Sequence, residues 1–397
     1  MLLVIISIAR RGVALLLFAA ALPALAASPA IVWQKTLGEP GIYYRPFTTA
    51  AGAGGTLFLA GSSTPAAAVP AGTRKPLSFW IWKLDGSGQL LWRTNVENPT
   101  PEQRSGEAYR SMRALVPAAD GGVAAIVEFQ PHHVFFIRLD AAGKQTVMVR
   151  LPLEKSDGLV YDLAPAGDHY LAAGRDGEQP FVMEIDPNGK KLRAVRFDRG
   201  GRGRITRIVA LTGGYLTCGE LGEIDRIDGV RKVWLARLDA NLSVISETML
   251  TGRNPAITRA DNGTIGVAYD RGGKNSLDWV LTAFSNSLTR KWDRPLLASP
   301  QLFPATISVV ADGDGFVAGG SEGGDFVLWR VSGGGTLDWK YQEQRTRPTG
   351  WLTAVESMTR LAGDPVAVAM IAEETEEHRP SFRVGVVRVA GLPGSQK

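Results

Sequence analysis

The sequence predicts an all-β fold: a single seven-bladed β-propeller of four-stranded blades, closed by pairing of the N-terminal strand with the C-terminal blade. Three observations predict it. A strand–turn–strand unit recurs seven times within the 397 residues, a second hairpin precedes each unit, and the last unit lacks its fourth strand. No segment shows the sustained 3.6-residue periodicity of an amphipathic helix.

The recurring unit is an apolar strand that ends in a tight polar turn. The predicted strands are 79–84, 134–139, 181–185, 233–238, 279–284, 326–331 and 382–389. The first turn residues are Asp85, Asp140, Asp186, Asp239, Ser285, Ser332 and Ala390, and they lie 46 to 58 residues apart. That spacing is the length of one four-stranded propeller blade.

Two positions downstream of the turn start support this alignment. The third residue after the turn start is glycine in four units, at Gly88, Gly143, Gly189 and Gly335, where a hairpin needs positive φ. The seventh residue after the turn start is tryptophan in three units, at Trp92, Trp292 and Trp339. The hairpin upstream of each unit has a turn rich in Gly and Asp, so each unit contains four strands, A to D.

The seventh unit ends where its strand D should begin. The missing strand is predicted at the other end of the chain, because segment 31–37 resembles strand 90–96 of the first blade, with Trp33 in the place of Trp92. Pairing of 31–37 with 382–389 closes the ring and leaves no free strand edge for association. We therefore expect a monomer.

A resemblance to a known family rests on the first unit. Its segment 83–92 reads Lys-Leu-Asp-Gly-Ser-Gly-Gln-Leu-Leu-Trp and is similar to the repeat of quinoprotein-type propellers and their non-catalytic periplasmic relatives. The chain thus resembles bacterial exported β-propeller repeat proteins over nearly all of residues 27–397. Quinoprotein dehydrogenases have eight blades, a calcium site and neighbouring cysteines, whereas this sequence has seven units and one cysteine. The resemblance therefore implies quinoprotein-like repeats without the quinoprotein catalytic features.

The N-terminus predicts export. Arg10 and Arg11 precede an apolar run at 13–22, and Ala24-Leu25-Ala26 fits a signal peptidase site. We expect a signal peptide over 1–26, a propeller domain over 27–397, and a periplasmic or secreted protein; the alternative is that the segment stays as an uncleaved anchor. No later segment is apolar enough to span a membrane.

Composition narrows the function classes. The formal net charge of +5 is mild for 397 residues and gives no case for nucleic acid. The single cysteine, Cys218, has no partner for an internal disulfide and is predicted to be buried in strand B of blade four.

The candidate site lies on one face of the predicted ring. The D-to-A and B-to-C loops share this face, here called the loop-rich face, and the short A-to-B and C-to-D turns share the opposite turn face. The candidate ligand-binding residues are Tyr44, Arg110, Arg113, Arg175, Arg204, Arg207, Glu220 and Trp351. Arginine with aromatic residues suits a carboxylate, phosphate or sugar ligand. In the alternative interpretation, these arginines form ion pairs with neighbouring acidic residues and only keep the channel opening hydrated, without binding a ligand.

The predicted function is an exported binding or assembly scaffold, with a protein partner or an anionic or polar polymer at the loop-rich face. No serine, cysteine or aspartate recurs with the four histidines at a catalytic offset, so no catalytic residue, metal ligand or cofactor is assigned. The alternative is an enzyme that acts on a sugar or cell-wall polymer where the central channel opens on the loop-rich face. Its candidate carboxylates are Glu128, Glu220 and Asp270. We expect Arg113→Ala and Arg207→Ala to weaken binding without unfolding the protein.

Overall fold

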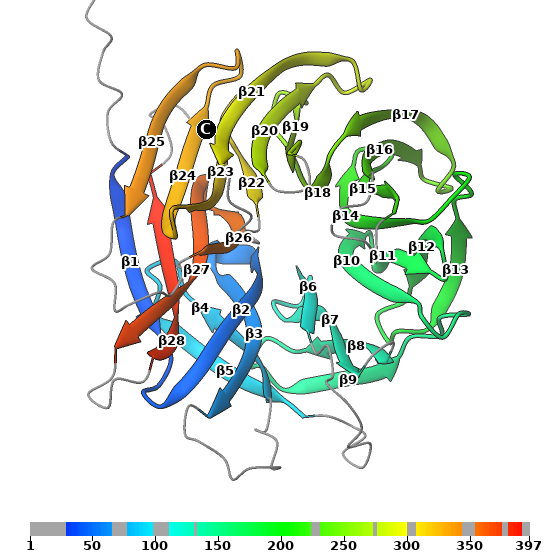
Figure 1. Cartoon of the computed structure of the whole chain (residues 1–397). Coiled ribbons are helices and arrows are strands. Elements are labelled where there is room, and N and C mark those ends of the chain that lie inside the picture. The colour runs from blue at the N-terminus through cyan, green and yellow to red at the C-terminus, as the bar shows by residue number, and fades with distance from the viewer. Residues whose placement is uncertain are drawn as a thin grey trace, which may run out of the picture.

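Seven four-stranded antiparallel sheets stand around a central channel as the blades of a propeller (Figure 1). The computed structural model describes residues 29–65, 78–97, 111–130, 133–223, 231–272, 276–299, 307–343, 354–374 and 380–390. The predicted fold and blade number are therefore confirmed. Nowhere in these ranges does a helix reach the length and apolarity that a membrane span requires.

Each blade runs from an inner strand A through B and C to an outer strand D. The A strands are β2 (Ile42–Ala51), β6 (Ser111–Pro117), β10 (Leu159–Ala166), β14 (Gly203–Leu211), β18 (Arg253–Arg259), β22 (Ser308–Asp312) and β26 (Ala354–Leu361). The B strands are β3 (Leu57–Pro65), β7 (Val123–Gln130), β11 (His169–Asp176), β15 (Gly214–Gly222), β19 (Ile265–Asp270), β23 (Gly315–Glu322) and β27 (Asp364–Glu374). The C strands are β4 (Ser78–Leu84), β8 (His133–Leu139), β12 (Gln179–Ile185), β16 (Arg231–Asp239), β20 (Leu277–Phe284), β24 (Asp325–Val331) and β28 (Pro380–Val389). The D strands are β5 (Leu90–Val96), β9 (Gln145–Arg150), β13 (Lys191–Arg196), β17 (Val244–Thr251), β21 (Arg290–Ser299), β25 (Leu337–Glu343) and β1 (Ile31–Leu37).

The ring closes as the repeat predicts. The dark-blue β1 lies beside the red β28 in Figure 1 and pairs with it antiparallel, with Thr36 opposite Gly385 and Leu37 opposite Val384. Blade seven is thus completed by residues from the opposite end of the chain, in the sheet order β1-β28-β27-β26.

The turns between strands C and D are held by their first residue. The Asp85 carboxylate accepts the N–H groups of Ser87 at 2.8 Å and of Gln89 at 2.9 Å, and the aspartates of blades two to four accept the equivalent pair. The third position after the turn start has positive φ, as at Gly88 with 80°. Blades four and five place Leu242 and Leu288 there instead, at 67° and 62°.

The repeated tryptophan connects neighbouring blades. The Trp92 indole Nε1 donates to the carbonyl of Ala141, in the turn of the next blade, at 2.9 Å. Trp33 and Trp292 make the equivalent bond, and in blade three Arg193 takes this role by donating to the carbonyl of Ala240 at 2.8 Å. The tryptophan spacing therefore reflects contacts between blades rather than contacts within one.

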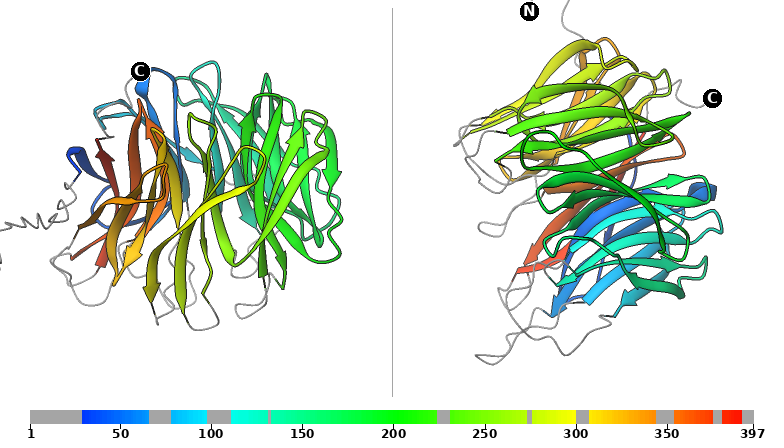
Figure 2. Two further views of the ribbon diagram at one scale, coloured as in Figure 1. Left: turned by 90° about the horizontal axis from the view of Figure 1, so that it is seen from above. Right: turned by 90° about the vertical axis from the view of Figure 1, so that its right-hand side faces the viewer.

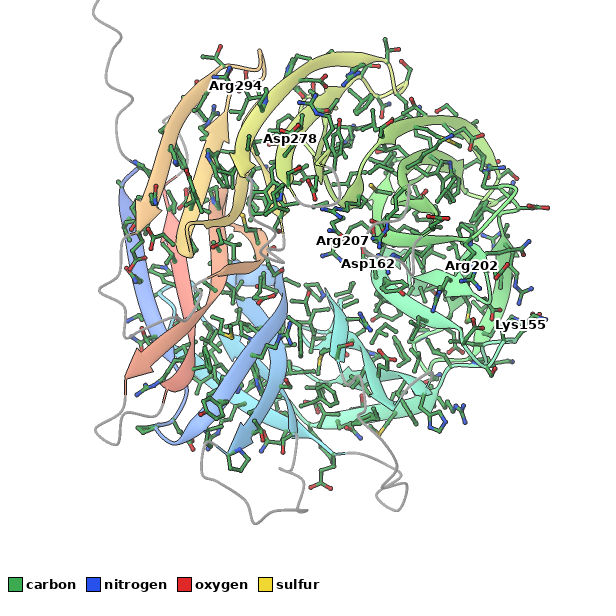
Figure 3. The ribbon with its side chains drawn as sticks, viewed as in Figure 1. Lys155, Asp162, Arg202, Arg207, Asp278 and Arg294 are labelled. Carbon is green, nitrogen blue, oxygen red and sulfur yellow. The ribbon has the colours of Figure 1, made fainter. Side chains whose placement is uncertain are left out.

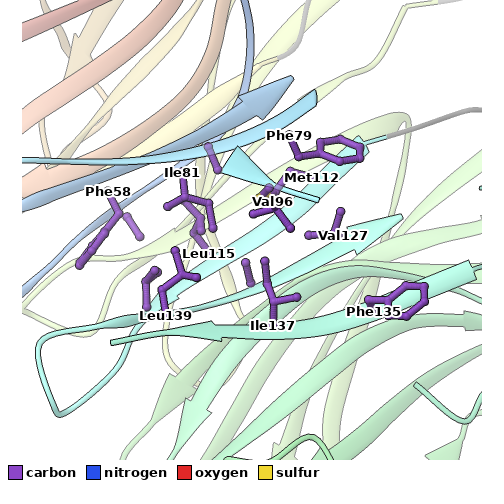
Figure 4. Close-up of a cluster of buried hydrophobic side chains, with 14 of the residues drawn as sticks. Phe58, Phe79, Ile81, Val96, Met112, Leu115, Val127, Phe135, Ile137 and Leu139 are labelled. Carbon is purple, nitrogen blue, oxygen red and sulfur yellow. The ribbon is translucent and has the colours of Figure 1, made fainter. Parts of the chain in front are cut away.

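The core lies between the blades, because each sheet buries both of its faces against its neighbours (Figures 1 and 2). Figure 4 shows one such layer, in which Phe79 and Ile81 of blade one pack against Val127 and Ile137 of blade two. The predicted burial of Cys218 is confirmed, since the side chain is fully buried in β15.

Candidate functional site

A β-bulge in the inner strand of each of the first four blades directs one extra side chain toward the channel. The residues of strand A that have no paired residue on strand B are Phe47, Arg113, Tyr161 and Thr206. A bulge inserts an unpaired residue and re-aims its side chain. All four line one cavity of about 440 Å³, here called the arginine cavity, whose other walls are Arg45, Ser111, Met112 and Arg207.

Glycines on strand B allow three of these bulges to form. A Cβ on Gly219 would lie 2.0 Å from the carbonyl oxygen of Arg204, and one on Gly174 would lie 1.9 Å from that of Leu159. Gly61 stands at the same place in blade one. No other residue leaves room for so close an approach of the bulged strand.

Buried carboxylates at the ends of the B strands hold several arginines. Arg113 Nη2 lies 2.7 Å from Glu128 Oε2, and Arg204 Nε donates to Glu220 Oε2 at 2.8 Å. The Glu220 side chain is 0% exposed, and its second oxygen accepts the N–H of Asn254 at 2.6 Å. For Arg113 and Arg204, therefore, the alternative prediction of ion pairing with neighbouring acids is the observed arrangement.

The same two arginines enclose Tyr161. The guanidinium carbons of Arg113 and Arg204 each lie 5.3 Å from the centroid of its ring, within the range of a cation–π contact. Burial acts to lower the pKa of Arg204, but the Glu220 charge and the Tyr161 contact outweigh it and raise that pKa above its ordinary value. Tyr161 is thus held as a fixed wall of the cavity.

Arg45 and Arg207 differ from these two. Within the described ranges neither guanidinium lies in ion-pair distance of a carboxylate. Arg207 Nη1 donates to the carbonyl of Thr206 at 3.1 Å, and the Arg45 guanidinium carbon stands 5.3 Å from the Phe47 ring centroid. Figure 3 shows Arg207 at the edge of the central opening. These two arginines therefore supply positive charge to the cavity that no ion pair among the described residues neutralises.

Asp162 is an acidic group that interacts electrostatically with Arg207. It lines the channel together with Arg207, and its Oδ2 accepts the N–H of Ile208 at 2.8 Å (Figure 3). Burial raises the pKa of the Asp162 carboxyl, and the charge of Arg207 opposes that rise. When it is ionised, Asp162 therefore offsets part of the positive charge of Arg207.

The structure brings together three of the residues that the sequence singled out. Arg113 and Arg207 line the arginine cavity, and Arg204 contacts its wall at Tyr161. Tyr44 does not, because it points to the other side of β2 and packs against Trp80 and Trp82.

The other candidates lie elsewhere. Glu220 is fully buried beneath Arg204, so it positions that arginine and offers no surface to a ligand. Arg175 lies near the end of β11, opposite Leu159 and Pro180. Arg110, Trp351 and the predicted signal peptide over 1–26 lie outside the described residues.

Sequence reasoning missed Phe47, Tyr161 and Asp162. The alternation of a regular strand gives no sign of a bulge, and a bulge changes which side chains face the channel. Strand B carries a glycine opposite three of the bulges, at Gly61, Gly174 and Gly219, and these glycines are the only local signal in the sequence that accompanies those three bulges.

No protein-family model matches the sequence, and no curated protein is recognisably similar to it. Three solved structures are similar in fold. A chain in the complex of Drosophila Plexin A with Semaphorin 1b has a TM-score of 0.53 at 8% identity, covering 93% of this chain and 88% of that one. The WD40 domain of Toxoplasma gondii coronin has a TM-score of 0.51 at 10% identity, covering 94% and 90%. The polysaccharide lyase Uly1 has a TM-score of 0.50 at 9% identity, covering 93% and 92%.

These similarities concern the fold alone. WD40 repeats form β-propellers, which agrees with the observed ring and with the propeller part of the resemblance drawn from the repeat. The β-propeller fold occurs both in enzymes and in binding proteins, so the function has to be argued from the site.

Proposed function

We propose that this chain is an exported, non-catalytic binding scaffold, whose arginine cavity holds an anionic group carried by a partner protein or by an anionic polymer. One observation supports the proposal most strongly: Arg45 and Arg207 line the cavity, and neither forms an ion pair with a carboxylate among the described residues. A guanidinium binds carboxylate or phosphate through paired, charge-assisted hydrogen bonds. Phe47 and Tyr161 add an apolar wall for the rest of the ligand.

The carboxylates needed for the alternative, an enzyme that acts on a sugar or cell-wall polymer, are otherwise engaged. Glycoside hydrolysis needs an acid and a carboxylate flanking the scissile bond. Glu128 and Glu220 are held by Arg113 and Arg204, and Asp270 accepts Arg253 Nε at 2.7 Å and two backbone N–H groups. This arrangement favours the scaffold over the enzyme.

The test uses poly-L-glutamate as an anionic probe. We expect binding, measured by calorimetry on the full chain, and we expect it to weaken as salt rises, because the cavity is open to solvent. Arg45→Ala or Arg207→Ala should each weaken it about ten- to a hundredfold, which is the loss of one charged hydrogen-bonding group. Arg150→Ala is the matched control, because Arg150 is exposed at the end of the outer strand β9. Equal losses from Arg150→Ala and Arg207→Ala would mean that only the net charge matters.

The structure changes the expectation for Arg113. Its removal would leave Glu128 buried and unpaired, which destabilises a protein by about 3 kcal/mol or more. We therefore expect Arg113→Ala and Arg204→Ala to lower the melting temperature clearly, whereas Arg45→Ala should leave it nearly unchanged. Arg207→Ala should lower it less than Arg204→Ala, because it removes only an electrostatic contact to Asp162 and no ion pair. Thermal unfolding of the four variants checks this division, and a stable Arg204→Ala protein would contradict it.

A further inference from the structure

The central channel continues beyond the arginine cavity toward the turn face. A second cavity of about 380 Å³, here called the channel cavity, is lined by Arg207, Arg259 and Arg360 among others. Arg207 also lines the arginine cavity, so the two cavities meet at this side chain (Figure 3). Both volumes lie within the roughly 300–1,000 Å³ of ligand sites. A ligand that binds at Arg207 therefore has room to extend from one cavity into the other.

The strand register places three of the channel arginines at different levels. Arg207 forms the first pair after the bulge of blade four, and Ala256 forms the first pair after the irregular part of the ladder in blade five. Arg259, the last residue of β18, lies three residues beyond Ala256, toward the turn face. At about 3.3 Å per residue, its level is about 10 Å from that of Arg207. Arg45 lies about 7 Å from that level in the other direction, two pairs before the corresponding pair of blade one.

Arg259 adds positive charge at the far end of this series. Within the described ranges it forms neither an ion pair nor a hydrogen bond, although it lines the channel cavity. Arg360 lies at the same level on β26, but its Nη1 is 3.1 Å from Asp261 Oδ2, and its Nε donates to the carbonyl of Gly363 at 3.1 Å. Arg45, Arg207 and Arg259 therefore supply positive charge at three levels that no ion pair among the described residues neutralises.

The rest of the channel cavity is not charged in the same way. Its walls carry apolar side chains and hydroxyl groups beside the arginines and Asp162, and these include Leu115, Ile257, Val309 and Met358 together with Thr258 and Ser308. A polymer with a charge on every unit would place some of its charges against apolar walls, which is unfavourable. An extended peptide with alternating acidic and apolar side chains avoids this, because side chains on one side of it are about 7 Å apart and those between them point the other way. The lining thus favours a peptide over a uronate polymer.

We propose that the arginine cavity and the channel cavity together bind an acidic peptide segment in extended conformation, with carboxylates at the levels of Arg45, Arg207 and Arg259. The proposal rests on the anion-binding function proposed above for the arginine cavity, and it specifies the class of ligand. The levels of Arg45 and Arg259 are about 17 Å apart, so the bound segment has about six residues. Each guanidinium pairs with a carboxylate through charge-assisted hydrogen bonds.

The experiment compares two peptides with blocked ends, using calorimetry on the full chain. A three-residue peptide, Glu-Leu-Glu, spans the levels of Arg45 and Arg207, whereas a seven-residue peptide of the same alternation also reaches Arg259. We expect the longer peptide to bind at least tenfold more tightly, because its third contact forms at high effective concentration. Arg259→Met removes the charge and keeps an apolar stem. It should weaken binding of the longer peptide about tenfold or more and leave the shorter one unchanged.

Three controls accompany this comparison. Arg207→Ala should weaken binding of both peptides, because both reach its level. Arg150→Met removes an exposed arginine at the end of β9 and should weaken neither. A seven-residue peptide with glutamine in place of glutamate should not bind. The melting temperature of Arg259→Met should equal that of the unmodified chain, because the substitution breaks no ion pair among the described residues.

The outcomes distinguish this proposal from the one on which it rests. If the short peptide binds through Arg207 but the long one binds no more tightly, or binds Arg259→Met equally well, the peptide does not extend through the channel and only the present proposal is wrong. If neither peptide nor poly-L-glutamate binds, both proposals are wrong. Polygalacturonate that bound more tightly than the long peptide, and lost affinity in Arg259→Met, would assign the channel to a uronate polymer and overturn the peptide assignment.

Discussion

Leu242 combines an unfavourable backbone with complete burial. Its φ of 67° lies in the left-handed region, which costs a residue with a Cβ about 1–2 kcal/mol. Its side chain is 0% exposed and packs between blades three and four, where burial of a leucine contributes about 1.5–3 kcal/mol. The contact between blades therefore outweighs the backbone strain, and leucine replaces the glycine found in the turns of blades one, two, three and six.

This balance makes an unusual prediction. Leu242→Ala loses the packing but keeps the strain, so it should destabilise the protein by about 2–4 kcal/mol. Leu242→Gly loses the packing and relieves the strain, so it should be at least as stable as the alanine variant, although glycine is ordinarily the worse choice. Urea unfolding of both variants measures the difference. A glycine variant clearly less stable than the alanine variant would mean that the turn imposes no strain at this position.

Asp162 is predicted to weaken both folding and anion binding when it is ionised. Burial raises its folded-state pKa above the unfolded value, so its favourable contribution is present at low pH and is lost as pH rises through the folded pKa. Asp162→Asn keeps the acceptor for the Ile208 N–H and removes the charge. We expect a higher melting temperature near pH 7 and no difference below the ordinary pKa of an aspartate, as thermal scans across pH would show.

The same substitution should strengthen binding of poly-L-glutamate by about three- to tenfold near pH 7, because it removes a negative charge beside Arg207. Glu220→Gln is the contrasting variant. Glu220 is an ion-paired carboxylate, so its neutralisation should destabilise the protein instead. Weaker anion binding by Asp162→Asn would show that the carboxylate orients Arg207 rather than competing with the ligand.

At the scale of the strands, the bulges depend on glycines that contact no ligand. Gly219→Ala would place a Cβ about 2.0 Å from the Arg204 carbonyl oxygen, so the inner strand of blade four has to move. We expect a loss of stability of about 1–3 kcal/mol, as for other overpacked sites, together with weaker poly-L-glutamate binding as Thr206 and Arg207 shift.

Gly201→Ala is the matched control for this substitution. Gly201 lies in the connection before β14, its φ is not positive, and nothing stands within 4 Å of its Cβ position. It should change neither stability nor binding. If Gly219→Ala behaved in the same way, the bulge would not depend on the close approach of the two strands.

The strands and turns were predictable because each carries its own local signal. The aspartate that begins a C-to-D turn caps two N–H groups within four residues, and the glycine after it supplies positive φ. The arginine cavity was only partly predictable. Arg113 and Glu128 belong to different strands, and a bulge decides that they meet. Tyr161 faces the channel for the same reason, which strand alternation does not reveal.

At the scale of the whole molecule, the arginine cavity depends on several blades at once. It is built from the inner strands β2, β6, β10 and β14 of blades one to four. Blade seven contributes no lining residue to it, so closure of the ring should affect the cavity only through the packing of blade seven against blade one.

Closure by β1 makes the most direct prediction about the whole fold. Deleting residues 29–37 removes the outer strand of blade seven, exposes the edge of β28, and takes away the Trp33 bond to the carbonyl of Gly86. Loss of a largely packed tryptophan alone costs about 3–5 kcal/mol, a large part of a typical folding free energy. We expect a much lower melting temperature, together with association through the exposed edge, seen by light scattering.

Rejoining the same strand after Ala390 through a short hairpin turn gives blade seven its four strands in the order of the other six. This relocated variant should recover a monomeric state and most of the lost stability, because the same side chains then fill the same edge. A truncated chain that kept its melting temperature, or a relocated strand that restored nothing, would mean that the ring is held by the contacts between blades and not by its closing strand.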